Sequence, residues 1–292
     1  MEFVMTSKIE LENVTYIYGK DTPFEVRALD SVNLSIYAGM ITGIIGHTGS
    51  GKSTLVRLFN GLEKPESGRV LLDDTDIWEK PREIGKVRFR VGLVMQYPEY
   101  QLFEETVAAD IAFGPRNMGL DGDEISRRVK EYAALTGVSE AELEKSPFDL
   151  SGGQKRRAAI AGVMAMEPEV LVLDEPAAGL DPEGKRMILG AVREYAGRRG
   201  ATVIIVSHSM EDMAELCDRV VVVANGKILC DGTRDEVFGA SELLIDAGLD
   251  IPELTRVSLM LAERGYKTEK TVYTLADATT EILKLYDRRQ TQ

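Results

Sequence analysis

The sequence predicts an α/β fold with a mainly parallel central sheet. Short apolar runs of strand length alternate with segments of helical periodicity along most of the 292 residues. Residues 41–45, 170–173 and 203–206 are such runs, with the apolar character of strands buried inside a sheet. A helical pattern follows each of the first two, after Gly51 and after Asp181. This order is typical of parallel strands joined by crossover helices.

In the first half of the chain, the sequence predicts strands before and after a Gly-rich loop. Residues 8–14 and 33–37 alternate with period two, and residues 68–95 return to strand patterns. A period of 3.6 after Gly51 predicts a helix, and residues 104–147 have a helical and acidic pattern. The residues expected on one face of the helix after Gly51 are Leu55, Leu58, Phe59 and Leu62.

The second half carries clear signals for helix starts and for one hairpin. Asp181 before Pro182 predicts a helix N-cap followed by the first helical position. Asn225-Gly226 between two apolar runs predicts a β-hairpin. Thr233 and Glu236 fit a capping box. After about residue 240 the composition changes, and two amphipathic helices are expected near 255–264 and 276–287.

Composition limits the classes of protein to consider. Hydrophobic residues make up 44% of the chain, which suffices for a packed core, and the net charge of −13 disfavours a nucleic-acid-binding face. Cys217 and Cys230 lie in no metal-binding spacing, so we expect two reduced thiols. No apolar run approaches the roughly 18 residues of a membrane span, and residues 1–5 do not begin a signal peptide. We therefore expect a soluble, intracellular chain whose membrane role needs a partner.

The Gly-rich loop between the strand at 41–45 and the following helix matches the pattern G-x-x-x-x-G-K-S/T. Its residues are Gly46, His47, Thr48, Gly49, Ser50, Gly51, Lys52 and Ser53. Such a loop turns backbone N–H groups toward phosphate oxygens, and the helix adds its positive N-terminus. Lys52 is expected on the β- and γ-phosphates of ATP, Ser53 on Mg²⁺ and Thr54 on the α-phosphate. The alternative, a chance Gly-rich turn, does not explain its place between a strand and a helix.

Two adjacent carboxylates end the apolar run at 170–173. Asp174 is expected to hold Mg²⁺ through its water shell, and Glu175 to orient or deprotonate the attacking water. Acidic strand ends are common in solvent, so the pair alone is weak evidence. The phosphate-binding loop upstream strengthens the interpretation.

A second anion-binding segment follows Leu150. Ser151, Gly152, Gly153 and Gln154 place free backbone N–H groups and a hydroxyl ahead of a helix, although an isolated segment of this kind can also be a simple helix cap. In this order of motifs the segment resembles the signature sequence of ABC (ATP-binding cassette) ATPases. The resemblance implies head-to-tail dimers in which each ATP lies between the loop of one subunit and the signature of the other.

Other family motifs follow in order. Gln96 resembles the glutamine that approaches Mg²⁺ and senses the γ-phosphate, and His208 the histidine that contacts the γ-phosphate. Asp181 resembles the residue that touches the opposite subunit's site. Tyr18 resembles the aromatic residue that stacks on adenine, with Tyr16, two residues away, as the alternative.

His47 and Ala177 lie inside these motifs, and neither is expected to act in catalysis. His47 is interpreted as a tolerated residue of the loop and not as a catalyst. Ala177 departs from the family, where Ser or Thr is common. Because Glu175 and His208 are both present, the departure is not expected to abolish ATP hydrolysis, so a binding or regulatory subunit with degraded ATP chemistry is disfavoured.

The resemblance implies a P-loop NTPase fold of the ABC ATPase type: a RecA-like parallel core sheet, an antiparallel β-subdomain and a helical subdomain. We assign residues 7–240 to the ATP-binding domain, with the helical subdomain at about 97–150. Residues 241–292 form a small α/β or helical extension. This extension is expected to brace a dimer, bind a regulator or cap the sheet.

Three segments narrow the resemblance to ATPases of energy-coupling factor importers, which include the cobalt- and nickel-type systems. They are residues 97–107, residues 112–119 and residues 150–162, together with the C-terminal extension. The resemblance implies uptake of a vitamin or transition-metal ion, at the cytoplasmic face of the membrane. The implied partners are a second ABC ATPase (a sister chain in preference to a second copy), a transmembrane coupling protein and a substrate-capture membrane protein.

Alternatives remain at this stage. The chain fits the ATPase of another ABC transporter subfamily less well. A non-transport ABC ATPase acting on nucleic acid or the ribosome fits least, given the single cassette and the acidic charge. A run of four residues, Tyr97, Tyr100, Leu102 and Phe103, is expected either to line a groove for a helix of the coupling protein or to pack the local core. Lys155, Arg156 and Arg157 are expected to pair with acidic neighbours, in preference to facing a partner.

Overall fold

A six-stranded sheet forms the centre of the computed structural model, which describes residues 6–266, 268 and 272–290. Residues 1–5, where no signal peptide is expected, lie outside the described part. The sheet order is β10-β9-β3-β8-β7-β6, parallel throughout except for β10 at the edge. Its strands are β3 (Ile41–Ile45), β6 (Val91–Val94), β7 (Val170–Asp174), β8 (Thr202–Val206), β9 (Arg219–Ala224) and β10 (Lys227–Thr233). The expected hairpin at Asn225-Gly226 joins β9 and β10, with both residues at positive φ.

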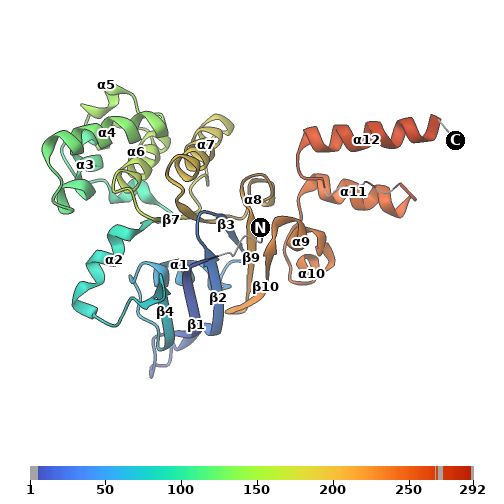
Figure 1. Ribbon diagram of the computed structural model, residues 1–292, viewed down its shortest axis with the longest axis horizontal. Helices are drawn as coiled ribbons and strands as arrows, with labels where there is room; N and C mark the ends of the chain where they lie inside the picture. Colours follow the sequence, from blue (N-terminus) through green and yellow to red (C-terminus); the bar gives the residue numbers. More distant parts are fainter. Residues whose placement is uncertain (1–5, 267, 269–271, 291–292) are drawn as a thin grey trace.

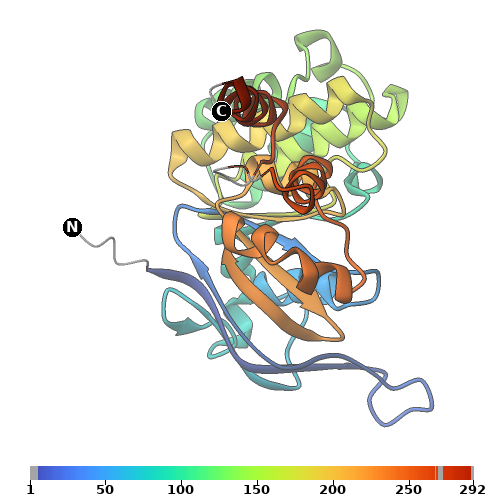
Figure 2. The same cartoon turned by 90° about the vertical axis from the view of Figure 1, so that its right-hand side faces the viewer.

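One face of this sheet packs against an antiparallel β-subdomain. The order there is β2-β1-β4-β5. Its strands are β1 (Ser7–Tyr18), β2 (Val26–Tyr37), β4 (Ser67–Leu72) and β5 (Thr75–Asp76). Helix α1 (Lys52–Phe59) contributes Leu55, Val56, Leu58 and Phe59 to a hydrophobic cluster shared with both sheets. The loop between β1 and β2 projects from the body (Figure 2).

Two sequence expectations in this region are wrong. Residues 84–90 form helix α2 (Ile84–Arg90), where strand patterns were expected. Ile84 and Val87 pack on the core at helical spacing. The helix is too short for a 3.6-residue period to be recognised in the sequence. Leu62 lies beyond the end of α1 and is 43% exposed. The chain turns away at Gly61, whose φ of +65° ends the helical path.

The helical subdomain lies at one end of the molecule (Figure 1). Its helices are α3 (Val107–Asn117), α4 (Gly122–Thr136), α5 (Glu140–Leu143) and α6 (Gly152–Met164). Short 3₁₀ turns precede α2, α3 and α6: η1 (Pro81–Glu83), η2 (Pro98–Gln101) and η3 (Pro147–Asp149). The remaining helices before the extension are α7 (Pro182–Arg199), α8 (Met210–Leu216) and α9 (Arg234–Gly239).

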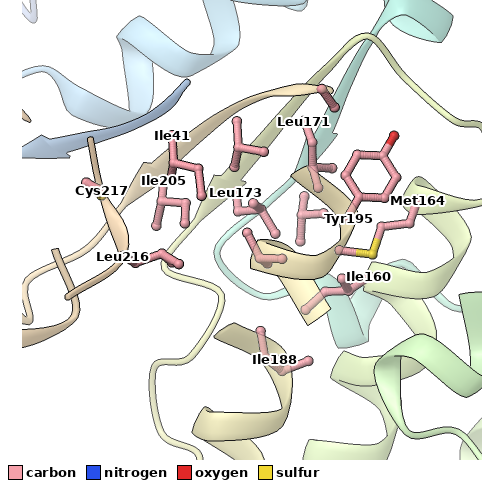
Figure 3. Close-up of a cluster of buried hydrophobic side chains, with 14 of the residues drawn as sticks. Ile41, Ile160, Met164, Leu171, Leu173, Ile188, Tyr195, Ile205, Leu216 and Cys217 are labelled. Atoms are coloured by element: carbon pink, nitrogen blue, oxygen red, sulfur yellow. The ribbon is translucent and has the colours of Figure 1, made fainter. Parts of the chain in front are cut away.

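A second hydrophobic cluster joins the other face of the central sheet to the helices (Figure 3). Leu171 and Leu173 of β7 and Ile205 of β8 meet Tyr195 of α7 and Met164 of α6 there, and all are buried. Because alternate side chains of each strand point to opposite faces, these strands bury both faces and carry apolar residues at nearly every position. Removing one such large side chain costs about 2–5 kcal/mol.

The described residues of the C-terminal extension form helices and loops with no strand, and the extension packs on this cluster. It consists of α10 (Ser241–Asp246), α11 (Glu253–Glu263) and α12 (Leu275–Gln290), and the last two project outward beyond α9 and α10 (Figure 1). Leu244, Ile251 and Tyr273 are buried members of the main cluster. This packing attaches the extension to the core of the ATP-binding domain. Among the described residues no helix has the length and apolarity to cross a bilayer.

Candidate functional site

Four neighbouring parallel strands end at one edge of the central sheet. The Gly-rich loop follows β3, Asp174 is the last residue of β7, and His208 comes two residues after β8. Gln96, an exposed residue, comes two residues after β6. The carboxyl ends of parallel strands form the edge where such folds bind ligands. The topology therefore brings the loop, both carboxylates, His208 and Gln96 to one side of the sheet.

The Gly-rich loop is held close to the surrounding backbone. A Cβ at Gly46 would lie 2.2 Å from the Val223 carbonyl oxygen, and one at Gly51 2.7 Å from that of Ala28. Gly51 also has a φ of +111° and starts α1, so glycine is required there. The Lys52 Nζ donates to the carbonyl oxygens of Gly46 at 2.7 Å and His47 at 2.9 Å. The lysine thus lies across the loop that would surround a phosphate.

The charged groups of the site are buried together. Lys52, Asp174 and Glu175 are 6%, 7% and 7% exposed. Burial lowers the pKa of Lys52, and the charges of Glu175 and Asp174 oppose that shift. Burial raises the pKa of Asp174, and a contact from the Ser53 side chain partly offsets it. The pKa of Glu175 rises to about 7 through burial and the neighbouring Asp174 charge.

Glu175 has the geometry of a constrained functional residue. Its φ of +53° is uncommon for a side chain of this size, and its backbone N–H donates to the Val206 carbonyl oxygen at 2.9 Å. The Glu175 Oε1 is buried, lies 3.2 Å from the His208 Nε2 and has no aligned hydrogen bond. Burial and the Lys52 charge lower the pKa of His208, whose side chain is 54% exposed. A buried carboxylate oxygen with unused hydrogen-bonding capacity suits a base for water.

A cavity of about 270 Å³ lies beside the loop on the β-subdomain side. Tyr18 lines it, and its hydroxyl is 3.0 Å from the Thr54 Oγ1. Tyr16 is not a lining residue; its hydroxyl donates to Glu63 at 2.5 Å, and its ring meets Tyr18 edge-on at 4.8 Å. This geometry favours Tyr18 as the residue that faces an adenine.

Sequence reasoning missed one wall of this cavity. Its residues are Val26, Arg27 and Ala28 of β2. They come to the site because β1 and β2 pair with Tyr18 opposite Val26. No local motif marks these three residues, and only the strand register identifies them.

The segment Ser151–Gln154 lies apart from the loop, in the helical subdomain (Figure 1). Ser151 is the N-cap of α6, and in the described part of the chain no hydrogen bond or ion pair joins this segment to residues 46–54. Asp181, the expected N-cap of α7, accepts from the Gly184 N–H at 2.7 Å. The His47 Nδ1 lies 2.9 Å from the Thr48 carbonyl oxygen, at the rim of the loop.

The oxygen donors suit a magnesium ion bound together with phosphates. Ser53 and Asp174 supply a hydroxyl and a carboxylate in contact with each other. Within the described ranges, no cluster of three or more His, Cys, Asp or Glu side chains forms a self-sufficient metal site. Mg²⁺ typically uses one or two protein oxygens plus substrate phosphates and water, so the donor set fits it.

Comparison with known proteins decides the family. The ABC transporter model matches residues 29–178. The chain is 50% identical to the energy-coupling factor transporter ATP-binding protein EcfA2 of Clostridium tetani over 97% of its own length and 99% of the relative's. The corresponding protein of Streptococcus pyogenes is 46% identical over 94% and 99%. This chain is an energy-coupling factor ATPase of the ABC transporter family.

Solved structures agree with this ABC ATPase assignment. CbiO1 from Clostridium perfringens, described as part of the ABC transporter complex cbiONQ, superposes with a TM-score of 0.73 at 39% identity, covering 89% of this chain and 97% of that one. The dimeric cassette MJ0796 bound to ADP and Pi gives 0.71 at 28% identity, covering 77% and 98%. The expected fold class is confirmed. Full-length similarity to energy-coupling factor ATPases disfavours the non-transport alternative.

Proposed function

We propose that this ATPase powers uptake of a vitamin or a transition-metal ion through an energy-coupling factor importer. The observation that supports ATP hydrolysis is the burial of Lys52, Asp174 and Glu175 together at the carboxyl ends of the parallel strands. The His208 Nε2 lies 3.2 Å from the Glu175 Oε1 there. A Lys for phosphate charge, a carboxylate for a metal and a second carboxylate for water are the parts that phosphoryl transfer to water needs.

Each residue has a distinct role in this proposal. The backbone N–H groups of 46–53 and the Lys52 ammonium hold the phosphates, and Thr54 lies at the base of the same helix. Ser53, Asp174 and Gln96 would hold Mg²⁺, which when bound neutralises charge on the β- and γ-phosphates. Glu175 takes a proton from the attacking water. His208 lies against Glu175 and contacts the γ-phosphate.

A single chain supplies only half of each closed site. Ser151, Gly152, Gly153 and Gln154 lie away from the loop of their own chain, on a separate subdomain. We propose that they bind the γ-phosphate of ATP held by a second ABC ATPase, with Asp181 beside them, because Leu180 approaches to within 3.4 Å of a Cβ built at Gly153. The dimeric form of a similar cassette supports this arrangement. A sister ATPase is the preferred second subunit.

The membrane partner is proposed to dock beside Gln96. Tyr97, Tyr100 and Phe103 are 57%, 84% and 59% exposed, so they do not pack the local core. Leu102, the fourth residue of this run, does pack against the core. Phe103 meets Phe113 edge-on at 4.9 Å, which extends the aromatic surface onto α3. Exposed aromatic residues are typical anchors for an amphipathic helix. The coupling protein supplies that helix, the substrate-capture protein holds the cargo, and this ATPase sits peripherally on the cytoplasmic face of the membrane.

Nucleic acid has no place in this proposal. The net charge of −13 opposes a phosphate backbone, and the arginines of α4, α6 and α7 are largely paired with carboxylates.

The experiment is purification of the tagged chain from its own cells in mild detergent. We expect a second ATPase and two polytopic membrane proteins to co-purify, and reconstitution of that complex to give ATP-dependent uptake. Recovery of only soluble proteins, ribosomes or DNA would remove the transport proposal and leave the ATPase.

A further inference from the structure

Two consecutive helices of the helical subdomain begin with capping boxes that contact each other. In α5, the Glu142 Oε2 accepts from the Ser139 N–H at 2.6 Å and from its hydroxyl at 2.8 Å. In α6, the Gln154 Oε1 accepts from the Ser151 N–H at 2.7 Å, and the Gln154 N–H donates to the Ser151 Oγ at 3.3 Å. The Gln154 Nε2 donates to the Glu142 Oε1 at 2.5 Å and so joins the two boxes.

A helix cap alone does not account for this link. The cap of α5 uses only the Oε2 of Glu142, and the cap of α6 uses only the Oε1 of Gln154. The remaining oxygen of Glu142 and the remaining nitrogen of Gln154 bond to each other across the two helix starts. Glu142 is 8% exposed, so its carboxylate is buried at this point, and both of its oxygens accept hydrogen bonds.

The charge of Glu142 determines how the Gln154 amide is oriented. Burial opposes ionisation, but the hydrogen bonds from Ser139 and Gln154 and the Arg157 charge outweigh it, so the pKa of Glu142 is lowered. An ionised carboxylate only accepts hydrogen bonds. It therefore requires the amide nitrogen of Gln154 on its side, which leaves the amide oxygen to face the Ser151 N–H. The Arg157 Nη2, 3.9 Å away, supplies a compensating positive charge.

This orientation determines what Ser151 presents to a ligand. The Gln154 carbonyl occupies the Ser151 N–H, and the Gln154 N–H occupies one lone pair of the Ser151 hydroxyl. The proton of that hydroxyl is left to donate outward. Gly152 and Gly153 are the first residues of α6, so their N–H groups have no carbonyl partner within the helix. A Cβ at Gly152 would meet nothing within 4 Å, so the space beside it is open.

We propose that Glu142 is a positioning residue for the γ-phosphate of the ATP bound by the opposing subunit: through Gln154 it holds the Ser151 hydroxyl and the α6 N-terminus in their donating arrangement. This inference rests on the proposed head-to-tail pairing. It predicts an effect on the partner's nucleotide and none on the nucleotide in the chain's own loop, because Glu142 lies in the helical subdomain.

The test uses the full-length chain carrying Glu175→Gln, mixed with the ATPase with which it pairs. Titration of the chain alone with a fluorescent ATP analogue reports its own loop, and sedimentation velocity of the mixture with ATP reports the closed dimer. We expect Glu142→Ala to change the affinity of the chain's own loop for the ATP analogue by less than twofold. The same variant should weaken ATP-dependent dimerisation about tenfold. Glu140→Ala, an exposed carboxylate on the same helical turn, is the matched control and is expected to behave as the parent.

Two further variants keep the result interpretable. Glu142→Gln keeps the shape of the side chain but has an NH2 donor in place of one oxygen, so it cannot accept from Ser139 and Gln154 through separate oxygens. It is expected to weaken dimerisation as Glu142→Ala does, which keeps the test valid if the alanine variant folds poorly. Gln154→Ala is expected to match Glu142→Ala, with the double variant no worse than either, because both act through one contact. Dimerisation of Glu142→Ala equal to that of Glu140→Ala would overturn the positioning role. A parent chain that binds ATP but never dimerises would overturn the head-to-tail proposal itself.

Discussion

Arg156 and Glu99 form a buried ion pair, with the Nη2 3.0 Å from the Oε1 and the Nε 3.2 Å from the Oε2. Their side chains are 7% and 18% exposed. Arg156 also donates to the Ala178 carbonyl oxygen. One guanidinium on α6 thus connects η2, beside the exposed aromatic residues, to the segment that leads into Asp181. Pairing with an acidic neighbour, the preferred expectation for this basic run, is confirmed for Arg156.

Breaking this ion pair is expected to destabilise the helical subdomain. Glu99→Gln leaves a buried Arg156 without its counter-charge, and the free energy of unfolding should fall by about 2 kcal/mol, below the value for a fully enclosed pair because Glu99 is partly exposed. Urea denaturation at neutral pH measures the change. Glu105→Gln, an exposed neighbour, should shift the midpoint little. Equal shifts for the two variants would show that the pair contributes nothing.

Replacement of Glu175 is expected to separate ATP binding from hydrolysis. Glu175→Gln keeps the shape of the side chain but removes the carboxylate proposed to take a proton from water, so turnover should fall by about 100-fold or more. ATP affinity should remain near that of the parent, and ATP should hold the dimer closed. Single-turnover hydrolysis and size-exclusion chromatography with ATP are the measurements. A normal rate for this variant would show that another residue activates the water.

Tyr18 is expected to stack on the adenine of ATP. Tyr18→Ala should weaken ATP binding about tenfold, since stacking of a base on an aromatic ring contributes about 1–3 kcal/mol. Tyr18→Phe keeps the ring and loses only the contact with Thr54, so its affinity should stay close to that of the parent. Equilibrium titration with ATP and with a nucleotide lacking the base compares them. A larger loss for Tyr16→Ala than for Tyr18→Ala would reverse the assignment.

The ion cluster around Glu169 predicts a pH-dependent contribution to stability. The Arg90 hydrogen bonds, with burial opposing and Lys8 adding to them, lower the pKa of Glu169 from 4.5 to about 2. A carboxylate with a lowered folded-state pKa stabilises the fold above its unfolded pKa and loses that contribution as pH falls toward the folded value. Glu169→Gln should therefore lower the urea midpoint at pH 7, and the difference from the parent should shrink as the pH falls below about 4.5.

A parallel series with Glu79→Gln, an exposed carboxylate, controls for general charge effects. A difference between Glu169→Gln and the parent that stays constant down to pH 3 would contradict the assigned pKa shift.

The sequence predicted candidate functional residues wherever a proposed function depends on consecutive residues. The Gly-rich loop of 46–53, the carboxylates at 174–175 and the capping segment at 151–154 need particular residue types at fixed spacing, because backbone N–H groups and a helix start must meet one anion. The strands that carry them were equally plain, since strands buried on both faces are apolar at nearly every position.

Tertiary structure decided what depends on residues far apart in the chain. The choice of Tyr18 over Tyr16 follows from which ring faces the cavity, which the pairing of β1 with β2 sets. Glu99, the partner of Arg156, lies 57 residues away in the chain, and no periodicity of the sequence predicts that the two residues pair. Helix α2 was missed because its seven residues are too few to show a 3.6-residue period. Sequence by itself determined which groups are candidates for binding phosphate. Packing determined which other side chains orient them, because orientation depends on contacts between separate elements.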